Sequence, residues 1–190
     1  MTSAMNRLIR RLQRLRHRKG FGVHSPFAFS LIADVAGSPG HYYGDNMLRD
    51  LVGARHGEVR CRAWLLHRLV ARLDPTVVVL PSGTPQMLAD AVKIARTDRP
   101  PVESLPAGKL RDVMLVADCG WLAVHDEETD RLLTSPGCTL MAYGSYADIS
   151  CLSVLAAEKM PGGWILADRR TAIYISSART PLQSYDVKLT

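Results

Sequence analysis

Three short apolar runs, separated by segments with helical spacing, constrain the fold of this chain more than any other feature of its sequence. The runs are "TVVVL" at 76–80, "DVMLVAD" at 112–118 and "CTLMAYG" at 138–144. Continuous apolar runs of this length are typical of parallel strands that are buried on both faces. Strands that alternate with helices predict an open α/β sheet with helices on both sides.

Helical patterns follow these runs at about 84–95, 126–133 and 148–160. Thr84 and Pro85 are expected to cap and start the first of these helices. The chain between that helix and the run at 112–118 is too short for a further strand and helix. A proline-broken loop with at most a very short strand is therefore expected in this interval.

The C-terminal part of the sequence predicts antiparallel pairing. "WILAD" and "TAIYIS" are separated by Arg169-Arg170, and this spacing favours a hairpin at the edge of the sheet. A last strand is predicted in "YDVKL" at 185–189. The predicted fold class is α/β, with a shortened Rossmann-like open sheet that is mainly parallel and has an antiparallel C-terminal edge.

Helices are predicted before the sheet. In "HSPF" at 24–27, Ser25 is expected to be an N-cap and Pro26 the first helical residue, and Gly37 is placed to end that helix. A short helix is expected from about Asp45. The segment 58–73 predicts a strong helix with its leucines buried and its arginines facing outward.

These patterns predict one domain over residues 1–190. It comprises a basic helical arm at 1–20, an N-terminal helical segment at 21–74 and a Rossmann-like core at 75–190. A chain of this length is sufficient for one domain with a substantial core.

The arm accounts for the basic character of the chain. The first nineteen residues hold seven of the 24 basic side chains and none of the 18 acidic ones. Leucines spaced along 4–18 predict a basic amphipathic helix. Such a helix is expected to contact an acidic surface, whether lipid, nucleic acid or a protein partner, through Arg7, Arg10, Arg11 and Arg14. The alternative is that the leucines pack on the body of the protein and the arginines are simply solvated.

Composition narrows the class of protein. Apolar residues make up 47% of the chain, as in soluble globular proteins, and no run approaches the ~20 apolar residues of a membrane span. We expect a cytoplasmic protein, with peripheral membrane association through the arm as an alternative. The four cysteines have neither C-x-x-C spacing nor a histidine at ligand spacing, which predicts reduced, mostly buried thiols and no metal.

The chain resembles a family of bacterial S-adenosylmethionine-dependent methyltransferases of class I. The resemblance is carried by the basic arm, "GVHSPFAF" at 22–29, Tyr42-Tyr43, the helix at 58–73 and the closing segment "TAIYISSARTPLQSYDVKL". It touches both ends of the chain and the framework between them. It implies a methyltransferase-type Rossmann-like sheet that holds the adenosyl cofactor at the carboxyl ends of its strands.

The sequence departs from the family where the cofactor should bind. In the family, an acid and two glycines follow the first strand, and their positions fall here on Val79, Pro81 and Pro85. A valine cannot neutralise the amine of the cofactor's methionine end, and burial of an unpaired charge costs several kcal/mol. The family's acidic pair after a later strand falls on Tyr143-Gly144 and is absent.

Four residues are the candidates for cofactor binding. Ser82, Gly83 and Thr84 lie in the turn after the first strand, and Asp118 stands at the carboxyl end of the second run. In open α/β sheets these strand ends are where ligands bind. Without an acid in the turn, an anionic ligand at the following helix N-terminus is an alternative to S-adenosylmethionine.

The function expected from these observations is that of a methyltransferase-like protein with a degraded cofactor site and weak or absent methyl transfer. The sequence does not decide whether the protein is an enzyme, and it indicates no catalytic residue or methyl acceptor. The alternative is a non-catalytic scaffold that binds a partner, an acidic lipid surface or nucleic acid through its arm. Nucleic acid is the weakest of these partners, because the sequence contains no recognisable reader motif.

Overall fold

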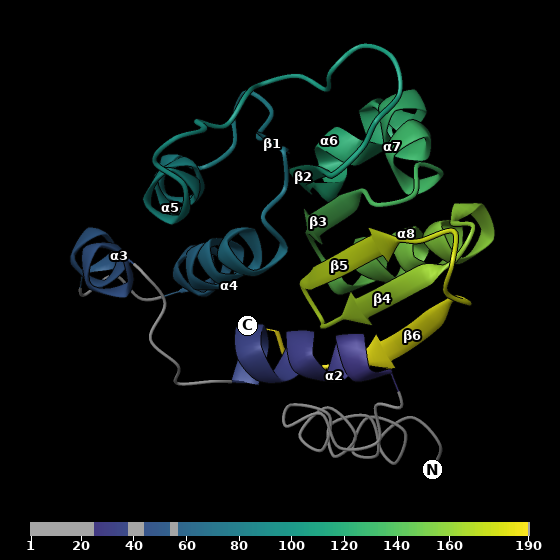
Figure 1. The fold of residues 1–190 in the computed structure, drawn as a ribbon, viewed down its shortest axis with the longest axis horizontal. Coiled ribbons are helices and arrows are strands. Elements are labelled where there is room, and N and C mark those ends of the chain that lie inside the picture. Colours follow the sequence, from purple (N-terminus) through teal and green to yellow (C-terminus); the bar gives the residue numbers. More distant parts are fainter. Residues whose placement is uncertain (1–24, 38–43, 54–56, 190) are drawn as a thin grey trace.

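The computed structural model describes residues 25–37, 44–53 and 57–189. This part of the chain forms a mixed six-stranded sheet flanked by helices (Figure 1). The strands are β1 (Val77–Val79), β2 (Val113–Asp118), β3 (Thr139–Tyr143), β4 (Gly163–Ala167), β5 (Thr171–Ser176) and β6 (Gln183–Asp186). The helices are α2 (Pro26–Leu31), the π-helical turn η1 (Ile32–Gly37), α3 (Asp45–Val52), α4 (Glu58–Leu73), α5 (Gln86–Ala95), α6 (Cys119–Val124), α7 (Asp126–Leu133) and α8 (Tyr146–Lys159).

The strand order is β1-β2-β3-β5-β4-β6. Strands β1, β2 and β3 are parallel, β5 runs antiparallel between β3 and β4, and β6 is parallel to β4. The prediction of a mainly parallel α/β sheet is confirmed, and the architecture is compatible with a Rossmann-like fold. The predicted antiparallel hairpin is confirmed as β4–β5, but it does not form the edge of the sheet, because β5 pairs inward with β3 and β6 covers the outer side of β4.

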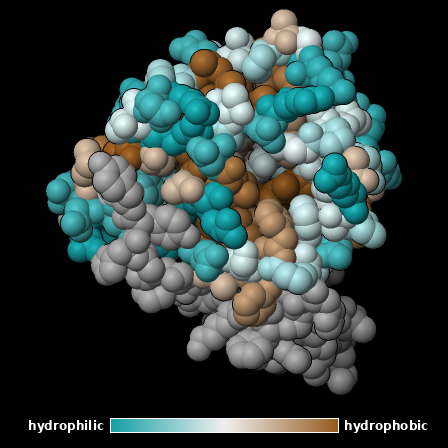
Figure 2. All heavy atoms as spheres, in the orientation of Figure 1, coloured by the Kyte–Doolittle hydropathy of each residue, from teal (hydrophilic) through white to brown (hydrophobic). Residues whose placement is uncertain are grey.

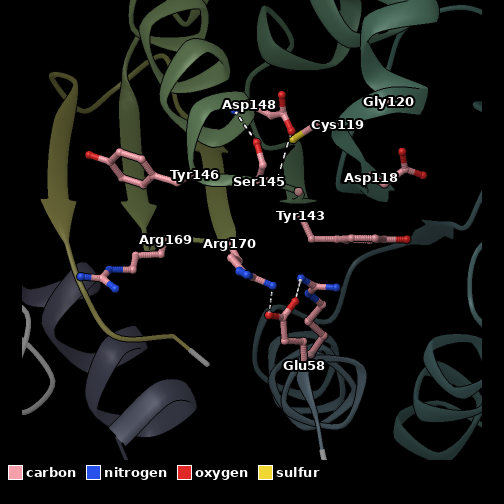
Figure 3. Close-up of a pocket in the computed structure, with 12 residues that line it drawn as sticks. Glu58, Asp118, Cys119, Gly120, Tyr143, Ser145, Tyr146, Asp148, Arg169 and Arg170 are labelled. Carbon is pink, nitrogen blue, oxygen red and sulfur yellow. Dashed lines mark hydrogen bonds and ion pairs between the residues drawn. The ribbon is translucent and has the colours of Figure 1, made fainter.

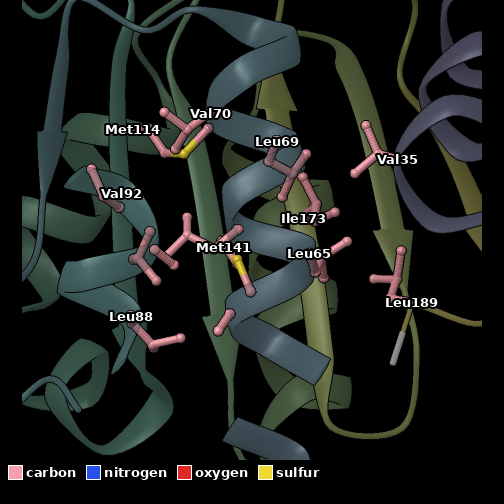
Figure 4. Close-up of a cluster of buried hydrophobic side chains, with 14 of the residues drawn as sticks. Val35, Leu65, Leu69, Val70, Leu88, Val92, Met114, Met141, Ile173 and Leu189 are labelled. Atoms are coloured by element: carbon pink, nitrogen blue, oxygen red, sulfur yellow. The ribbon is translucent and has the colours of Figure 1, made fainter. Parts of the chain in front are cut away.

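Both faces of the sheet are buried, which explains the continuous apolar runs of the sequence. Met114 and Val116 point into a core shared with α4 and α5, whereas Leu115 and Ala117 point into a second core under α6, α7 and α8. Figure 4 shows the first core, where Leu65, Leu69 and Val70 of α4 lie over Met114, Met141 and Ile173 of the sheet. Successive strand residues alternate between the two faces, so a parallel strand between two helical layers has no exposed side.

Residues 25–27, the described part of the "HSPF" segment, begin α2 and attach it to the sheet. The Ser25 hydroxyl accepts a hydrogen bond from the Ala28 backbone N–H at 3.3 Å and another from the Trp164 indole at 2.9 Å. Pro26 is the first helical residue, and the Phe27 ring packs on Trp164 with 4.3 Å between the centroids. The N-cap prediction is confirmed, whereas Gly37 is the last residue of η1 rather than the glycine that follows an α-helix.

The segment between α5 and β2 contains the expected remnant of a strand. Val102 forms a single parallel bridge with Val79 on the free side of β1. It exchanges backbone hydrogen bonds with Val78 and Leu80, of 2.9 and 2.8 Å. The sheet therefore ends at β1 with one bridge where a full strand would otherwise lie.

The structure differs from the sequence-based expectations at four further points. Helix α5 begins at Gln86 without a side-chain cap, because the Thr84 hydroxyl donates instead to the Pro81 carbonyl at 2.7 Å. Helix α6 is not predicted by the sequence pattern, and the last strand lies at Gln183–Asp186 rather than at 185–189. The expectation of mostly buried thiols is also wrong, because two of the four free cysteines, Cys61 and Cys151, are exposed.

The basic arm at 1–20, with Arg7, Arg10, Arg11 and Arg14, lies outside the described residues, as do His24 and Tyr42-Tyr43. Among the helices that are described, none combines the length and the apolar character needed to cross a bilayer. On the face drawn in Figure 2, hydrophilic side chains predominate around the periphery and hydrophobic ones gather toward the middle.

Candidate functional site

A crevice of about 660 Å³ lies at the carboxyl ends of β2 and β3. The ends of these strands form its floor, the first turns of α4 and the β4–β5 turn form one wall, and the starts of α6 and α8 form the other (Figure 3). The residues that line it are Glu58, Arg62, Asp118, Cys119, Gly120, Tyr143, Gly144, Ser145, Tyr146, Asp148, Arg169 and Arg170. Ligands of open α/β sheets bind at this end of the strands.

The first wall, here called the basic wall, consists of Arg62, Arg169, Arg170 and Glu58. The Glu58 carboxylate accepts a hydrogen bond from the Arg62 guanidinium at 2.9 Å and another from Arg170. Figure 3 shows Glu58 and Arg170 facing each other beneath the end of β3. Three guanidinium groups and one carboxylate give this wall a net positive charge.

Arg62 is held firmly within the basic wall. Its side chain is only 11% exposed, and its guanidinium lies over the Tyr143 ring, 4.8 Å from the centroid. This contact contradicts the expectation that the arginines of the 58–73 helix all face outward. A buried guanidinium packed on an aromatic face gains cation–π attraction and loses little further freedom when it binds a ligand.

The opposite wall, here called the acidic wall, consists of Asp118, Asp148 and Cys119. Asp118 is the N-cap of α6, and its carboxylate accepts a hydrogen bond from the Trp121 N–H at 3.0 Å. Asp148 forms a capping box with Ser145 at the start of α8, and these hydrogen bonds lower the pKa of its carboxyl. Both carboxylates therefore already satisfy orphan N–H groups of helix termini.

Cys119 is not a nucleophile in this setting. Burial, followed by the nearby charges of Asp148 and Asp118, raises the pKa of its thiol to about 11. The thiol is also enclosed on one side, because a Cβ at Gly144 would lie 2.9 Å from its sulfur. Since the reactive form of cysteine is the thiolate, the Cys119 thiol is inert near neutral pH.

The structure brings one of the four predicted site residues, Asp118, to the crevice. Thr84 does not line the crevice, but its side chain lies near Tyr143, a lining residue whose phenol has a pKa raised chiefly by burial. Ser82 and Gly83 are exposed on the turn after β1 and do not line the crevice. The crevice therefore lies over β2 and β3 and not over the predicted cofactor turn.

The cofactor turn itself lacks an available carboxylate. Val79, at the position of the family's acid, is completely buried and packs with Leu115 and Ala117 in the core under α6–α8. Gly83 has φ +88° and open space around its Cα. The turn thus allows a close approach to its backbone, but it provides no group that could neutralise a cation.

Most of the crevice was missed by sequence reasoning. The basic wall is built from segments that are distant in the sequence, since Glu58 and Arg170 are 112 residues apart. In the sequence, Arg169-Arg170 is recognisable only as the connection of a hairpin. The one available signal was this pair of adjacent like charges at a hairpin tip, where small turn-forming residues are more usual.

The described residues contain no cluster of three or more histidine, cysteine or acidic side chains suited to a metal ion. Comparison of the chain with models of protein families, with curated proteins and with solved structures finds no match.

Proposed function

We propose that this protein is a methyltransferase-like binding protein whose adenosyl-cofactor site is degraded, so that it transfers methyl groups weakly or not at all. The proposal combines the sequence resemblance with the composition of the strand ends. The observation that carries it is the absence of an available carboxylate at the turn after β1, where Val79 is buried in the core.

S-adenosylmethionine does not fit the residues present at this turn. Its methionine end carries an ammonium group that needs an anionic partner once it leaves water. Among the predicted site residues, only Asp118 has a carboxylate, and this carboxylate caps α6. The strand that would supply the next part of such a site is reduced to the single bridge at Val102.

The sheet supports the part of the proposal that concerns the methyltransferase-like fold. The mainly parallel strands, the inserted antiparallel β5 and the helices on both faces are compatible with the architecture that the resemblance implies. The sheet is well packed, since strand residues such as Leu115 and Met141 are completely buried. The same fold can host different sites, so a crevice at the strand ends can bind a ligand without methyl transfer.

Calorimetric titration of the full chain with S-adenosylhomocysteine tests the proposal. We expect no saturable heat at millimolar ligand. Asp118→Asn is the matched control, because asparagine also caps a helix but carries no charge. Saturable binding to the wild type that is lost in Asp118→Asn would show that Asp118 serves the cofactor, and the proposal would then be rejected.

A further inference from the structure

The arginines of the basic wall converge from two elements that are distant in the sequence. Arg62 comes from the second turn of α4, and Arg169 and Arg170 form the tip of the β4–β5 hairpin. The hairpin tip is fixed to the end of β3, because the Gly144 N–H donates to the Arg170 carbonyl at 3.1 Å. Within the tip, the Asp168 N–H donates to the Thr171 carbonyl at 2.8 Å. The cluster is therefore set by the fold and not by one exposed segment.

The hairpin does not require arginines at its tip. Short hairpin connections favour glycine, asparagine and aspartate, whose backbones adopt the turn geometry readily. Adjacent arginines repel each other, and Arg170 reduces this repulsion by pairing with Glu58. Arg169 lines the crevice, and no ion pair of its side chain is found within the described part of the chain. Two like charges at this point are therefore better explained by a ligand than by the turn.

Arg62 adds a preorganised donor to this pair. Its guanidinium is stacked on Tyr143 and hydrogen-bonded to Glu58, so its rotamer is already fixed. Its Nε–H is enclosed and has no hydrogen-bond partner among the described residues, which is a cost to the folded state. The contacts with Tyr143 and Glu58 explain the fixed position of Arg62, but they leave this N–H donor unused.

Glu58 occupies the position that an external oxyanion would take. Its carboxylate receives hydrogen bonds from both Arg62 and Arg170, as a bound carboxylate or phosphate would. The side chain of Glu58 is 45% exposed, so it can swing away from the crevice without disturbing the core. With Glu58 counted, the basic wall keeps an excess of two positive charges, which Asp118 and Asp148 on the acidic wall balance; when Glu58 swings away, the crevice has one excess positive charge for an oxyanion.

We infer that this crevice binds a small organic oxyanion, a phosphate or carboxylate compound, through Arg62, Arg169 and Arg170, and that Glu58 is displaced when the ligand binds. Guanidinium groups recognise both kinds of oxyanion by paired hydrogen bonds. A volume of about 660 Å³ leaves room for the rest of a small molecule, which would lie against Tyr146 and the acidic wall. The inference goes beyond the proposed function and does not depend on the state of the cofactor turn.

The test is a calorimetric titration of the full chain with pyrophosphate and, separately, with citrate, at constant ionic strength. Arg170→Ala and Arg169→Ala should each weaken binding about tenfold, since a hydrogen bond to a charged group contributes roughly that factor. Glu58→Gln should strengthen binding several-fold, because it removes the internal competitor and its charge. Arg62→Lys, which keeps the charge but loses the planar fork, should also weaken binding.

Arg99→Ala is the matched control, because Arg99 is half-exposed and pairs with Asp98 outside the crevice. Opposite effects of Glu58→Gln and Arg170→Ala, with Arg99→Ala unchanged, would establish the site, and the preferred probe would identify phosphate or carboxylate as its ligand class. Equal affinity in all variants, or no binding of either probe, would overturn the inference. The result is separable from the cofactor question, because titration with S-adenosylhomocysteine tests a different ligand.

Discussion

Replacement of Asp118 by alanine distinguishes a helix cap from a cofactor ligand. In the structure, the carboxylate of Asp118 accepts a hydrogen bond from the Trp121 N–H at 3.0 Å and lies at the N-terminus of α6. Loss of an N-cap side chain costs about 1 kcal/mol, and loss of a negative charge at a helix N-terminus adds about 0.3–1 kcal/mol. Asp118→Ala should therefore lower the free energy of unfolding by about 1–2 kcal/mol.

Asp118→Asn separates the two contributions. Asparagine keeps an acceptor for the Trp121 N–H and removes only the charge, so this variant should lose no more than about 1 kcal/mol. The assay is equilibrium unfolding in urea, followed by circular dichroism, with the slope of the transition compared between proteins. If Asp118→Ala is as stable as the wild type at equal slope, the carboxylate is not a significant cap and the reasoning about the acidic wall fails.

Further predictions concern the arm, a thiol and two structural contacts. Deletion of residues 1–19 removes seven basic side chains and no acidic one. This deletion should abolish binding to vesicles that contain phosphatidylserine, while the circular dichroism spectrum of the remaining protein is unchanged. Undiminished vesicle binding in a co-sedimentation assay would contradict a role for the arm. The pKa of the Cys119 thiol is raised to about 11, so iodoacetamide should alkylate Cys119 about a hundredfold more slowly at pH 8 than a thiol of ordinary pKa. The rate should rise as the pH approaches 11, and rapid labelling at neutral pH in peptide mass spectra would refute this. Gly163→Ala should prevent stable folding, because the new Cβ would lie 1.9 Å from the Ile175 carbonyl oxygen. Gly83 has open space around it, so Gly83→Ala should lower the free energy of unfolding by only about 1 kcal/mol, through left-handed backbone strain. Similar unfolding midpoints for the two variants would count against the packing described. Ser25→Ala should lower the free energy of unfolding by about 1–2 kcal/mol, since it removes the cap of α2 and the acceptor of the Trp164 indole; an unchanged midpoint in urea would show that this contact contributes little.

The sequence predicted the layers of the fold because hydrophobic periodicity reports burial directly. Residues 113–117 alternate between two cores, so every position of the strand before Asp118 is apolar. The strand order at the C-terminal side was harder to predict, because a hairpin pattern does not say which of its two strands pairs inward. In this chain β5 pairs with β3, and the short strand β6 closes the outer side of β4.

The candidate site was predicted only in part, since its residues meet through tertiary packing. Asp118 could be identified because a strand end followed by an acid is a local pattern. Arg62 could not, because the spacing of the 58–73 helix assigns its arginines to solvent, and only the position of Tyr143 turns this one inward. The pairing of Glu58 with Arg170 links the start of α4 to a hairpin tip, which no local pattern reports.

The central claim is that the turn after β1 has lost its hold on an adenosyl cofactor. The most direct measurement is a titration of the ¹⁵N-labelled full chain with S-adenosylhomocysteine, in which the amide chemical shifts of Ser82, Gly83 and Thr84 are followed. We predict that these amides do not shift at millimolar ligand. Saturable shifts confined to this turn and to Asp118 would contradict the account.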